Sequence, residues 1–444
     1  MITFILVLGD ILIFYLSLFL TLILRYKIFV FEKFSGHFLP FTLILILWIL
    51  VFYIAGIYEK RRLRNSIEFL KTLFIAIILN TFLSIAFFYL VPFSDITPRR
   101  NLFIFVIIFS CLEILWRQYF NKLLIYKLPK NRILLLSGNG NSALEIYDFL
   151  LSHKQLGYEI VHFWKIENIQ EKFNNLNSWK EFIKENNIDL VVIPLSFKKE
   201  SNFSKIFYEL LFSGILVYDL PYFYETIFKK IPLSEIDESW FLEKIIEPEK
   251  FYDKLKSALE FIFALFLIFF LLPLEIFIAL LIKITSEGPV IYKQVRIGKN
   301  NKPFTLYKFR TMHKDAEKDG PKWKIAGDYD PRFTFIGRIL AKTHLDELPQ
   351  LINVLKGEIS FVGPRPERPE FVSILEEKIP YYNIRHLIKP GITGWAQINY
   401  KYGASIEDTY EKLQYDIYYL KNRSIILDLA IILKTLKSFF VSNK

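Results

Sequence analysis

Long apolar segments dominate the first part of the chain. Three of them approach the roughly 20 residues that an α-helix needs to cross a bilayer: residues 3–24, 38–57 and 69–91. A fourth segment, 102–120, is interrupted near its end by Glu113 and Arg117, so we expect part of it to face protein rather than lipid. The pattern predicts a transmembrane domain of four helices over residues 1–125.

The loops of this domain differ in charge. Basic residues cluster after the second and the fourth segment: Lys60, Arg61, Arg62, Arg64, Arg117, Lys122, Lys127, Lys130 and Arg132. Lys and Arg are enriched in cytoplasmic loops of membrane proteins. The sequence therefore predicts a multi-pass membrane protein whose later domains face the cytoplasm.

β-like and helix-like segments alternate from residue 132 to about 220, which is typical of a doubly wound, Rossmann-like α/β domain. We assign this domain to residues 130–245. Its first turn reads Gly138-Asn139-Gly140-Asn141-Ser142-Ala143 and resembles a relaxed dinucleotide fingerprint. A carboxylate is expected at the end of the second strand of an NAD site, whereas Trp164 and Lys165 precede Glu167 here. We favour a tight strand-to-helix turn and expect no NAD.

One more apolar segment, 261–282, contains Pro273 near its middle. Proline removes a helical hydrogen bond and kinks a helix. Lys254, Lys256 and Lys283 flank the segment at both ends, which disfavours a straight crossing. We predict a re-entrant membrane hairpin over 258–283 with Pro273 as the membrane break; a kinked ordinary span is the alternative. The hairpin opens a third domain, residues 250–444.

Composition narrows the partners. Apolar residues make up 53% of the chain, and the formal net charge is +11. In a chain with so many membrane-length segments, this charge favours anionic lipid or phosphate over nucleic acid. The single cysteine, Cys111, excludes an internal disulfide.

Two β-like segments, 291–297 and 304–311, are joined by a turn-rich link and predict a hairpin. Six basic side chains load it with charge that suits phosphate oxygens or lipid headgroups: Lys293, Arg296, Lys299, Lys302, Lys308 and Arg310. A solvated basic face explains any one of them equally well.

Two adjacent carboxylates, Asp346 and Glu347, stand where a helix is predicted to begin. One could attack a phosphorus atom while its neighbour holds a metal ion, and a helix start stabilises both carboxylate and phosphate. Thr343 and Asp346 also have capping-box spacing, so a purely structural role in closing the helix end is the alternative.

Residues 254–440 resemble the bacterial sugar transferase family, whose members are polyprenyl-phosphate hexose-1-phosphate transferases. The resemblance rests on motifs that occur in the family's order: Gly288-Pro289-Val290, Lys308-Phe309-Arg310-Thr311-Met312, Leu345-Asp346-Glu347-Leu348-Pro349-Gln350, Val362-Gly363-Pro364-Arg365-Pro366, Lys389-Pro390-Gly391-Ile392-Thr393-Gly394-Trp395 and Tyr415-Asp416-Ile417-Tyr418-Tyr419. The upstream half looks like that of the long-form members, which start exopolysaccharide, capsule or O-antigen synthesis at the bacterial inner membrane.

The resemblance implies a reaction and roles. Asp346 would attack the β-phosphorus of a UDP-sugar, release UMP and hold the sugar phosphate until polyprenyl phosphate collects it. Glu347 would bind Mg²⁺, or Mn²⁺ in its place. Substrate-binding roles fall on Lys308, Arg310, Pro364, Arg365, Pro366 and Asp416.

Three departures from the family pattern stand out. Ala341 replaces an Arg before Lys342, so the phosphate contact of that Arg is either absent or supplied elsewhere, with Arg338 and Lys342 as the candidates. His344 replaces a Ser two positions before Asp346, and we expect it to pack or cap rather than bind metal. Leu272 replaces the Ser that precedes Pro273.

Two other functions remain open at this point. A membrane-anchored, NAD-dependent sugar-nucleotide dehydratase or epimerase would need a Tyr-x-x-x-Lys pair, and Tyr252 and Lys256 have that spacing. A non-catalytic nucleotide-sensing scaffold would leave the later motifs unused. The sequence does not identify the sugar, and a homodimer is an expectation from general oligomer statistics.

Overall fold

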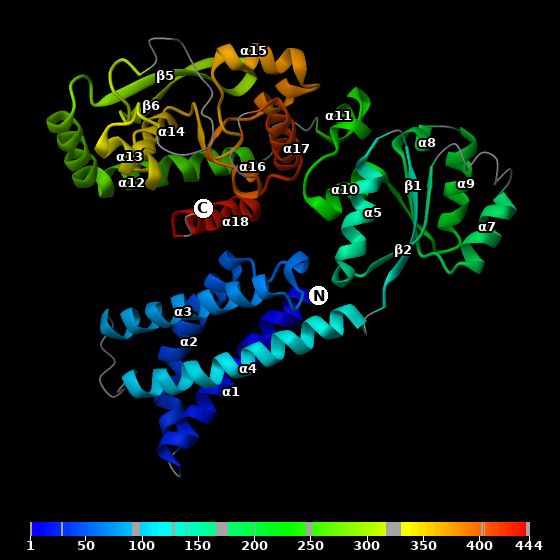
Figure 1. The fold of residues 1–444 in the computed structure, drawn as a ribbon, viewed down its shortest axis with the longest axis horizontal. Coiled ribbons are helices and arrows are strands. Elements are labelled where there is room, and N and C mark those ends of the chain that lie inside the picture. The colour runs from blue at the N-terminus through cyan, green and yellow to red at the C-terminus, as the bar shows by residue number, and fades with distance from the viewer. Residues whose placement is uncertain are drawn as a thin grey trace. The chain divides into compact units, whose positions relative to one another are not determined.

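A computed structural model describes residues 2–27, 30–90, 98–126, 129–138, 140–165, 176–199, 201–245, 251–316, 330–400, 403 and 405–440. The chain divides into two units, Met1–Asp219 and Leu220–Lys444, drawn as a ribbon in Figure 1. The predicted fold class is confirmed: apolar N-terminal helices, a parallel-sheet α/β domain and a C-terminal α/β region.

The four predicted membrane segments form the long helices α1 (Ile2–Tyr26), α2 (Val30–Ala55), α3 (Ile67–Leu90) and α4 (Pro98–Tyr126). Each contains a stretch that is long and apolar enough to cross a membrane. Aromatic side chains fill the core between them, with ring centroids 4.8 Å apart for Phe14 and Phe105 and for Trp48 and Phe109. The first unit therefore begins with a membrane helix bundle.

Charged residues in this bundle face one another. Arg117 is fully buried, bonds to Asp10 on α1, and donates to Glu113 one turn earlier at 2.6 Å. The Tyr58 hydroxyl donates to Asp10 at 2.7 Å. An ionisable group at this depth needs a protein partner, and the prediction that Glu113 and Arg117 face protein is confirmed.

The α/β domain contains one parallel sheet in the order β2-β1-β3-β4. Its strands are β1 (Asn131–Ser137), β2 (Tyr158–Lys165), β3 (Leu190–Ile193) and β4 (Leu216–Asp219). Helix α5 (Ser142–Ser152) covers one face, and α7 (Leu176–Glu185) and α9 (Ser201–Leu211) cover the other (Figure 1). The short helix α8 (Leu195–Lys199) follows β3. Helices on both faces are the doubly wound arrangement that the alternation predicts.

The glycine-rich turn joins β1 to α5. Gly138 and Gly140 flank Asn139, which lies outside the described residues, as does Glu167 beyond the end of β2. Asn141 precedes α5 without a side-chain cap. The turn thus connects a strand to a helix, and the structure assigns no ligand to it.

The second unit begins at Leu220 and includes residues upstream of 250, where the sequence places the start of the third domain. Helices α10 (Leu220–Phe228) and α11 (Glu238–Lys244) belong to it. Glu225 accepts from Asn422 at 2.7 Å, and the Ile231 amide donates to the Gln414 carbonyl at 3.1 Å. These contacts tie the segment to the C-terminal helices, and alternation of strands and helices alone could not reveal them.

The remaining elements of the second unit frame a small α/β domain. They are α12 (Phe251–Thr285), β5 (Ile291–Ile297), β6 (Pro303–Phe309), α13 (Phe335–Thr343), α14 (Gln350–Leu355), β7 (Ser360–Val362), α15 (Pro369–Lys378), β8 (Gly391–Thr393), α16 (Trp395–Asn399), α17 (Ile406–Asn422) and α18 (Ile425–Phe440). Strands β5 and β6 form the predicted antiparallel hairpin, and β7 pairs with β8 in parallel.

The predicted membrane hairpin at 258–283 is one helix, α12, which extends beyond both predicted ends and contains Pro273. A straight helix of its 35 residues would be about 52 Å long, far more than the hydrocarbon core of roughly 30 Å. Figure 1 draws α12 as two arms set at an angle. Ala264 packs in one apolar cluster of the second unit and Ile278 in another. Both arms therefore lie against the same unit, as a re-entrant helix requires.

Candidate active site

A single turn carries Asp346 and Glu347. Helix α13 ends at Thr343, His344 adopts a left-handed backbone with φ of 56°, and Leu345–Glu347 form one 3₁₀ turn before Pro349 and α14. The Thr343 hydroxyl donates to the Ile339 carbonyl at 2.8 Å rather than closing a capping box. The capping box considered for Thr343 and Asp346 is therefore not formed, because the threonine side chain bonds within its own helix.

The N-terminus of α13 is fixed by a close backbone contact. Thr334 caps the helix by accepting from the Gly337 amide at 2.9 Å. A Cβ on Gly337 would lie 1.8 Å from the Thr311 carbonyl oxygen, so only glycine lets α13 approach the end of the hairpin this closely. This contact sets where the acidic turn lies relative to β6.

Two basic side chains hold Glu347. Lys308 on β6 and Arg365 both donate to its Oε1 atom, at 2.9 Å and 2.7 Å. Burial alone would raise the pKa of Glu347, but the charges of Arg365 and Lys308 outweigh it and hold that pKa well below the usual range. Glu347 is therefore an ionised carboxylate in a fixed position.

Asp346 stands in contrast to its neighbour. It is 8% exposed, and its carboxylate has no hydrogen-bond partner within the part of the chain that the structure describes. Burial raises its pKa, Lys308 lowers it, and the adjacent Glu347 charge raises it again. A carboxylate with unengaged oxygens beside two cations is suited to attack an electron-poor centre.

Hydrogen bonds to its backbone carbonyls fix the turn that carries Arg365. The Pro364 carbonyl accepts from the Gly391 amide at 2.9 Å, and the Pro366 carbonyl accepts from Arg296 at 2.9 Å. Arg385 donates to the Arg365 carbonyl, also at 2.9 Å. Pro364 and Pro366 thus fix the backbone of Arg365 while its guanidinium reaches Glu347.

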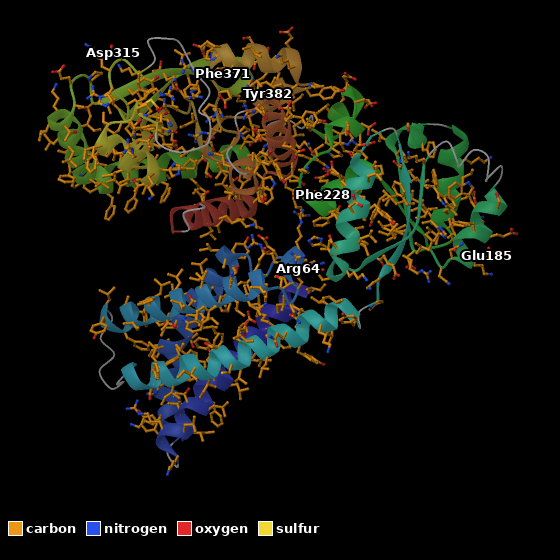
Figure 2. The ribbon with its side chains drawn as sticks, in the orientation of Figure 1. Arg64, Glu185, Phe228, Asp315, Phe371 and Tyr382 are labelled. Carbon is orange, nitrogen blue, oxygen red and sulfur yellow. The ribbon has the colours of Figure 1, made fainter. Side chains whose placement is uncertain are left out.

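Asp416 lies behind this turn rather than at the acidic pair. It is buried on α17 and accepts from Nε and Nη2 of Arg385 at 3.0 Å and 2.9 Å. Arg385 also donates to the hydroxyl of Tyr382 at 2.7 Å, the side chain labelled in Figure 2. Asp416 therefore acts on Arg365 through Arg385.

Arg310 lies away from the acidic pair, whereas two other predicted basic residues are exposed on α13. Arg310 is buried and donates to the Ser286 carbonyl at 2.9 Å and to the Glu287 carbonyl, in the segment that directly follows α12. Arg338 and Lys342 lie on the exposed side of α13. The structure thus brings together Lys308, Arg365, Asp346 and Glu347.

The start of α12 is joined to the same site by buried polar contacts. Lys256 donates to the Val362 carbonyl and to the Tyr419 hydroxyl, both at 2.8 Å, and pairs with Asp428 at 3.0 Å. Tyr252 donates to Asp428 at 2.5 Å. Val362 ends β7 and directly precedes the turn with Arg365. This cluster links the membrane helix to the residue that holds Glu347.

Sequence reasoning missed two positioning groups. Asn353 on α14 accepts from the Tyr307 amide at 3.1 Å and donates to the Thr305 carbonyl at 2.7 Å, which fixes β6 and Lys308 against α14. Arg385 belongs to no quoted motif. A buried asparagine on an apolar helix face was a visible signal for Asn353.

The acidic pair has partial capacity for a divalent cation. Among the described residues no group of three or more His, Cys, Asp or Glu side chains forms a metal cage. Lys308 and Arg365 occupy Oε1 of Glu347, which leaves Oε2 without a protein partner in the described chain. One carboxylate oxygen completed by substrate phosphates and water fits Mg²⁺.

Comparison with known proteins gives two family matches. A family described as bacterial sugar transferase matches residues 251–442, and one described as CoA-binding domain matches residues 53–221. An exopolysaccharide production protein of Rhizobium leguminosarum is 40% identical over 196 residues, which cover 43% of this chain and 97% of that protein.

Longer relatives match over a smaller share. A UDP-N-acetylgalactosamine-undecaprenyl-phosphate N-acetylgalactosaminephosphotransferase of Aeromonas hydrophila is 39% identical over 224 residues, which cover 50% of this chain and 52% of that protein. An undecaprenyl-phosphate glucose phosphotransferase of Komagataeibacter xylinus is 41% identical over 217 residues, 48% of this chain and 38% of that protein. The chain thus spans about half or less of the length of these two relatives.

Proposed function

This chain belongs to the bacterial sugar transferase family, and we propose that it is a phosphoglycosyl transferase. It transfers a hexose 1-phosphate from a UDP-sugar to polyprenyl phosphate and yields polyprenyl-diphosphate-sugar and UMP. The names of its relatives describe transfer of N-acetylgalactosamine phosphate or glucose phosphate to undecaprenyl phosphate. The reaction would be the first membrane step of exopolysaccharide, capsule or O-antigen synthesis.

The reaction proceeds in two displacements. A carboxylate oxygen of Asp346 bonds to the β-phosphorus of the donor, and the bond from that phosphorus to the bridging oxygen breaks, so that UMP leaves with the electron pair. A phosphate oxygen of polyprenyl phosphate then bonds to the same phosphorus and displaces Asp346 as a free carboxylate. Charge is conserved at each step, and the aspartate is regenerated.

Neighbouring groups stabilise the charge that moves. Lys308 and Arg365 both bond to Oε1 of Glu347 on the acidic turn, where they can also contact phosphate oxygens. Glu347 would hold Mg²⁺ through Oε2, and the ion would neutralise charge on the diphosphate. Arg385 and Asp416 keep Arg365 in place.

One observation carries this assignment: the two adjacent carboxylates differ in their hydrogen bonds and in the direction of their pKa shifts. Glu347 is bonded twice and its pKa is depressed, whereas Asp346 is unbonded within the described chain and its pKa is raised. If both carboxylates had only a structural role, each would be expected to have a hydrogen-bond partner. A fixed ligand beside an unengaged nucleophile accounts for the difference.

Location follows from the helices. Both arms of α12 pack on the catalytic unit, which supports a site at one face of the membrane. Ile426 on α18 is 81% exposed, as suits a helix at the bilayer surface. We place the site at the cytoplasmic face of the bacterial inner membrane, where it meets the lipid acceptor.

The decisive experiment uses purified protein in lipid nanodiscs, a panel of UDP-sugars and Mg²⁺. With donor alone, intact-protein mass spectrometry is expected to trap a phosphosugar adduct on Asp346, and Asp346→Asn abolishes both the adduct and UMP release. Asp315→Asn, at an exposed residue of the same unit, is the matched control. Full turnover by Asp346→Asn, or no adduct under any donor, contradicts the covalent route.

The structure does not support the Tyr-x-x-x-Lys pair that the dehydratase alternative needs. Tyr252 and Lys256 are engaged with Asp428 and Val362 of the second unit, whereas the glycine-rich turn is part of the first. No observation favours a scaffold without activity over the arrangement of Asp346 and Glu347. Activity that needs NAD instead of polyprenyl phosphate would revive the dehydratase.

A further inference from the structure

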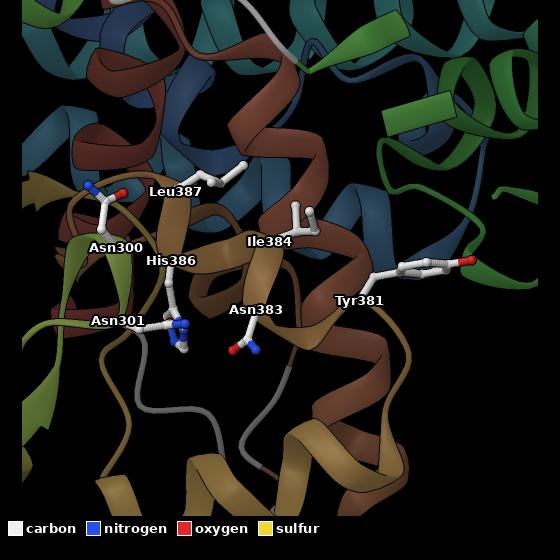
Figure 3. Close-up of a pocket in the computed structure, with 7 residues that line it drawn as sticks. All are labelled: Asn300, Asn301, Tyr381, Asn383, Ile384, His386 and Leu387. Atoms are coloured by element: carbon white, nitrogen blue, oxygen red, sulfur yellow. Dashed lines mark hydrogen bonds between the residues drawn. The ribbon is translucent and has the colours of Figure 1, made fainter. Parts of the chain in front are cut away.

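A separate cavity of about 330 Å³ opens between the tip of the β5–β6 hairpin and the 3₁₀ segment Tyr382–Leu387 (Figure 3). It is lined by Asn300, Asn301, Tyr381, Asn383, Ile384, His386 and Leu387. None of these side chains carries a formal charge once His386 is neutral, although the chain as a whole has a net charge of +11. Such a lining disfavours an anionic ligand.

His386 is the most informative residue of this cavity. It is 7% exposed, and its Nδ1 bonds to Oδ1 of Asn301. Burial, followed by the charge of Arg385, lowers its pKa to about 3. The imidazole is therefore neutral at physiological pH, and with Nδ1 as the donor, Nε2 carries a lone pair.

That lone pair is unsatisfied. Nε2 of His386 is buried and has no hydrogen-bond partner in the described chain. Buried polar atoms are normally paired with protein, water or ligand. Figure 3 shows the His386 ring and the Asn383 amide on the same side of the 3₁₀ segment. An acceptor and an adjacent amide thus face a ligand that offers a hydroxyl or N–H donor.

Apolar and polar groups line the cavity together. Leu387 is 45% exposed and Ile384 half-buried, while the asparagines each offer a donor and an acceptor. A sugar ring matches both, because its hydroxyl groups donate and accept and its C–H face is apolar. We propose that this cavity binds a neutral sugar ring, with one hydroxyl donating to Nε2 of His386 and a neighbouring hydroxyl bonding to Asn383.

This site is distinct from the one at Asp346. Lys308, which reaches Glu347, follows Asn301 at the far end of β6. Strands rise about 3.3 Å per residue, so the Cα atoms of Asn301 and Lys308 lie roughly 20 Å apart. A sugar bound at His386 is thus a second saccharide, separate from the one transferred, and the inference does not rest on the transfer reaction.

Saturation-transfer-difference NMR on the full chain in nanodiscs tests it, with methyl pyranosides of glucose, galactose, N-acetylglucosamine and N-acetylgalactosamine as probes. At least one pyranoside is expected to give ring-proton signals that fall at least fivefold in His386→Phe and in Asn383→Ala. His153→Phe, in the α/β domain, is the control and should leave the signals unchanged.

Asn383 is exposed, so its variant should fold even if the His386 variant does not, which circular dichroism and thermal unfolding would reveal. Absence of signal from every pyranoside, or signals that persist in Asn383→Ala and in a folded His386→Phe, overturns the proposal. Uridine that binds here in place of every pyranoside would also overturn it and would identify the cavity as a base site.

Discussion

Replacement of Lys308 by methionine tests how the acidic pair, Asp346 and Glu347, responds to pH. Lys308 is 19% and Glu347 10% exposed at the side chain, so their interaction is little screened by solvent. A hydrogen bond to a charged group contributes about 1.5–3 kcal/mol, and one pKa unit corresponds to about 1.4 kcal/mol. Loss of Lys308 should therefore raise the pKa of Glu347 by about 1–2 units.

Removal of Lys308 should shift the pKa of Asp346 in the same direction as that of Glu347. Lys308 lowers the pKa of Asp346 against the effect of burial, so its removal raises that pKa as well. Both carboxylates act in the ionised form, and activity is lost as pH falls through their pKa values. Because the pKa of Asp346 is already raised, it sets the acid limb, and Lys308→Met should move this limb to higher pH.

UMP release in a single turnover with donor alone, measured across pH, is the appropriate assay, because polyprenyl phosphate and its own titration are then absent. Lys308→Arg should restore the acid limb, since it keeps the charge. Lys356→Met removes an exposed lysine that donates to Tyr307 at 2.9 Å and serves as the control. An acid limb that stays in place or moves to lower pH in Lys308→Met would refute the reasoning.

Three other substitutions follow from the buried contacts. Asp416→Asn should lower kcat about tenfold with little change in KM, because Arg385 loses its anchor and the loss of one good charged contact is about 1.4 kcal/mol; a change in KM alone would contradict this. Lys256→Met, which frees the Val362 carbonyl, should lower UMP release while Lys256→Arg retains part of it; equal loss in both would argue for a merely structural site. Arg117→Leu should destabilise the membrane bundle by about 3–5 kcal/mol, seen as a lower unfolding temperature in detergent; an unchanged temperature would show that the carboxylates need no partner.

Hydropathy and alternation predicted the elements of both units but not every boundary. The strands of the α/β domain alternate with helices as expected, because each β-strand is a short apolar run between turn residues. Helix α12 begins at Phe251, before the predicted hairpin at 258–283, because Lys256 and Glu260 are polar and hydropathy does not assign them to an apolar segment. In the fold they are inside the helix, where Glu260 accepts from Ser360 and the Phe361 amide at 2.5 Å and 2.9 Å. Burial of a charge by a distant partner leaves no periodic signal.

The site was predictable where residues are neighbours in sequence and obscure where the fold brings them together. Asp346, Glu347 and the Pro364-Arg365-Pro366 turn stand in motifs. Arg385 and Asp416, which lie 31 residues apart, meet only because the 3₁₀ segment packs against α17. The family motif predicts Asp416 as a substrate-binding residue, whereas Arg385, which links it to Arg365, has no motif to mark it.

Lys308 and Arg310 show why charge and spacing are insufficient. Two residues apart on a strand, they should share one face of the hairpin. Strand β6 ends at Phe309, however, so the alternation stops before Arg310, whose guanidinium meets the carbonyls of Ser286 and Glu287 at the end of α12. Both residues follow Thr285, the last residue of α12, so the buried arginine fixes the segment that leaves the helix. The same basic motif thus supplies one cation to the acidic pair and one to the membrane helix, and the end of a strand decides which is which.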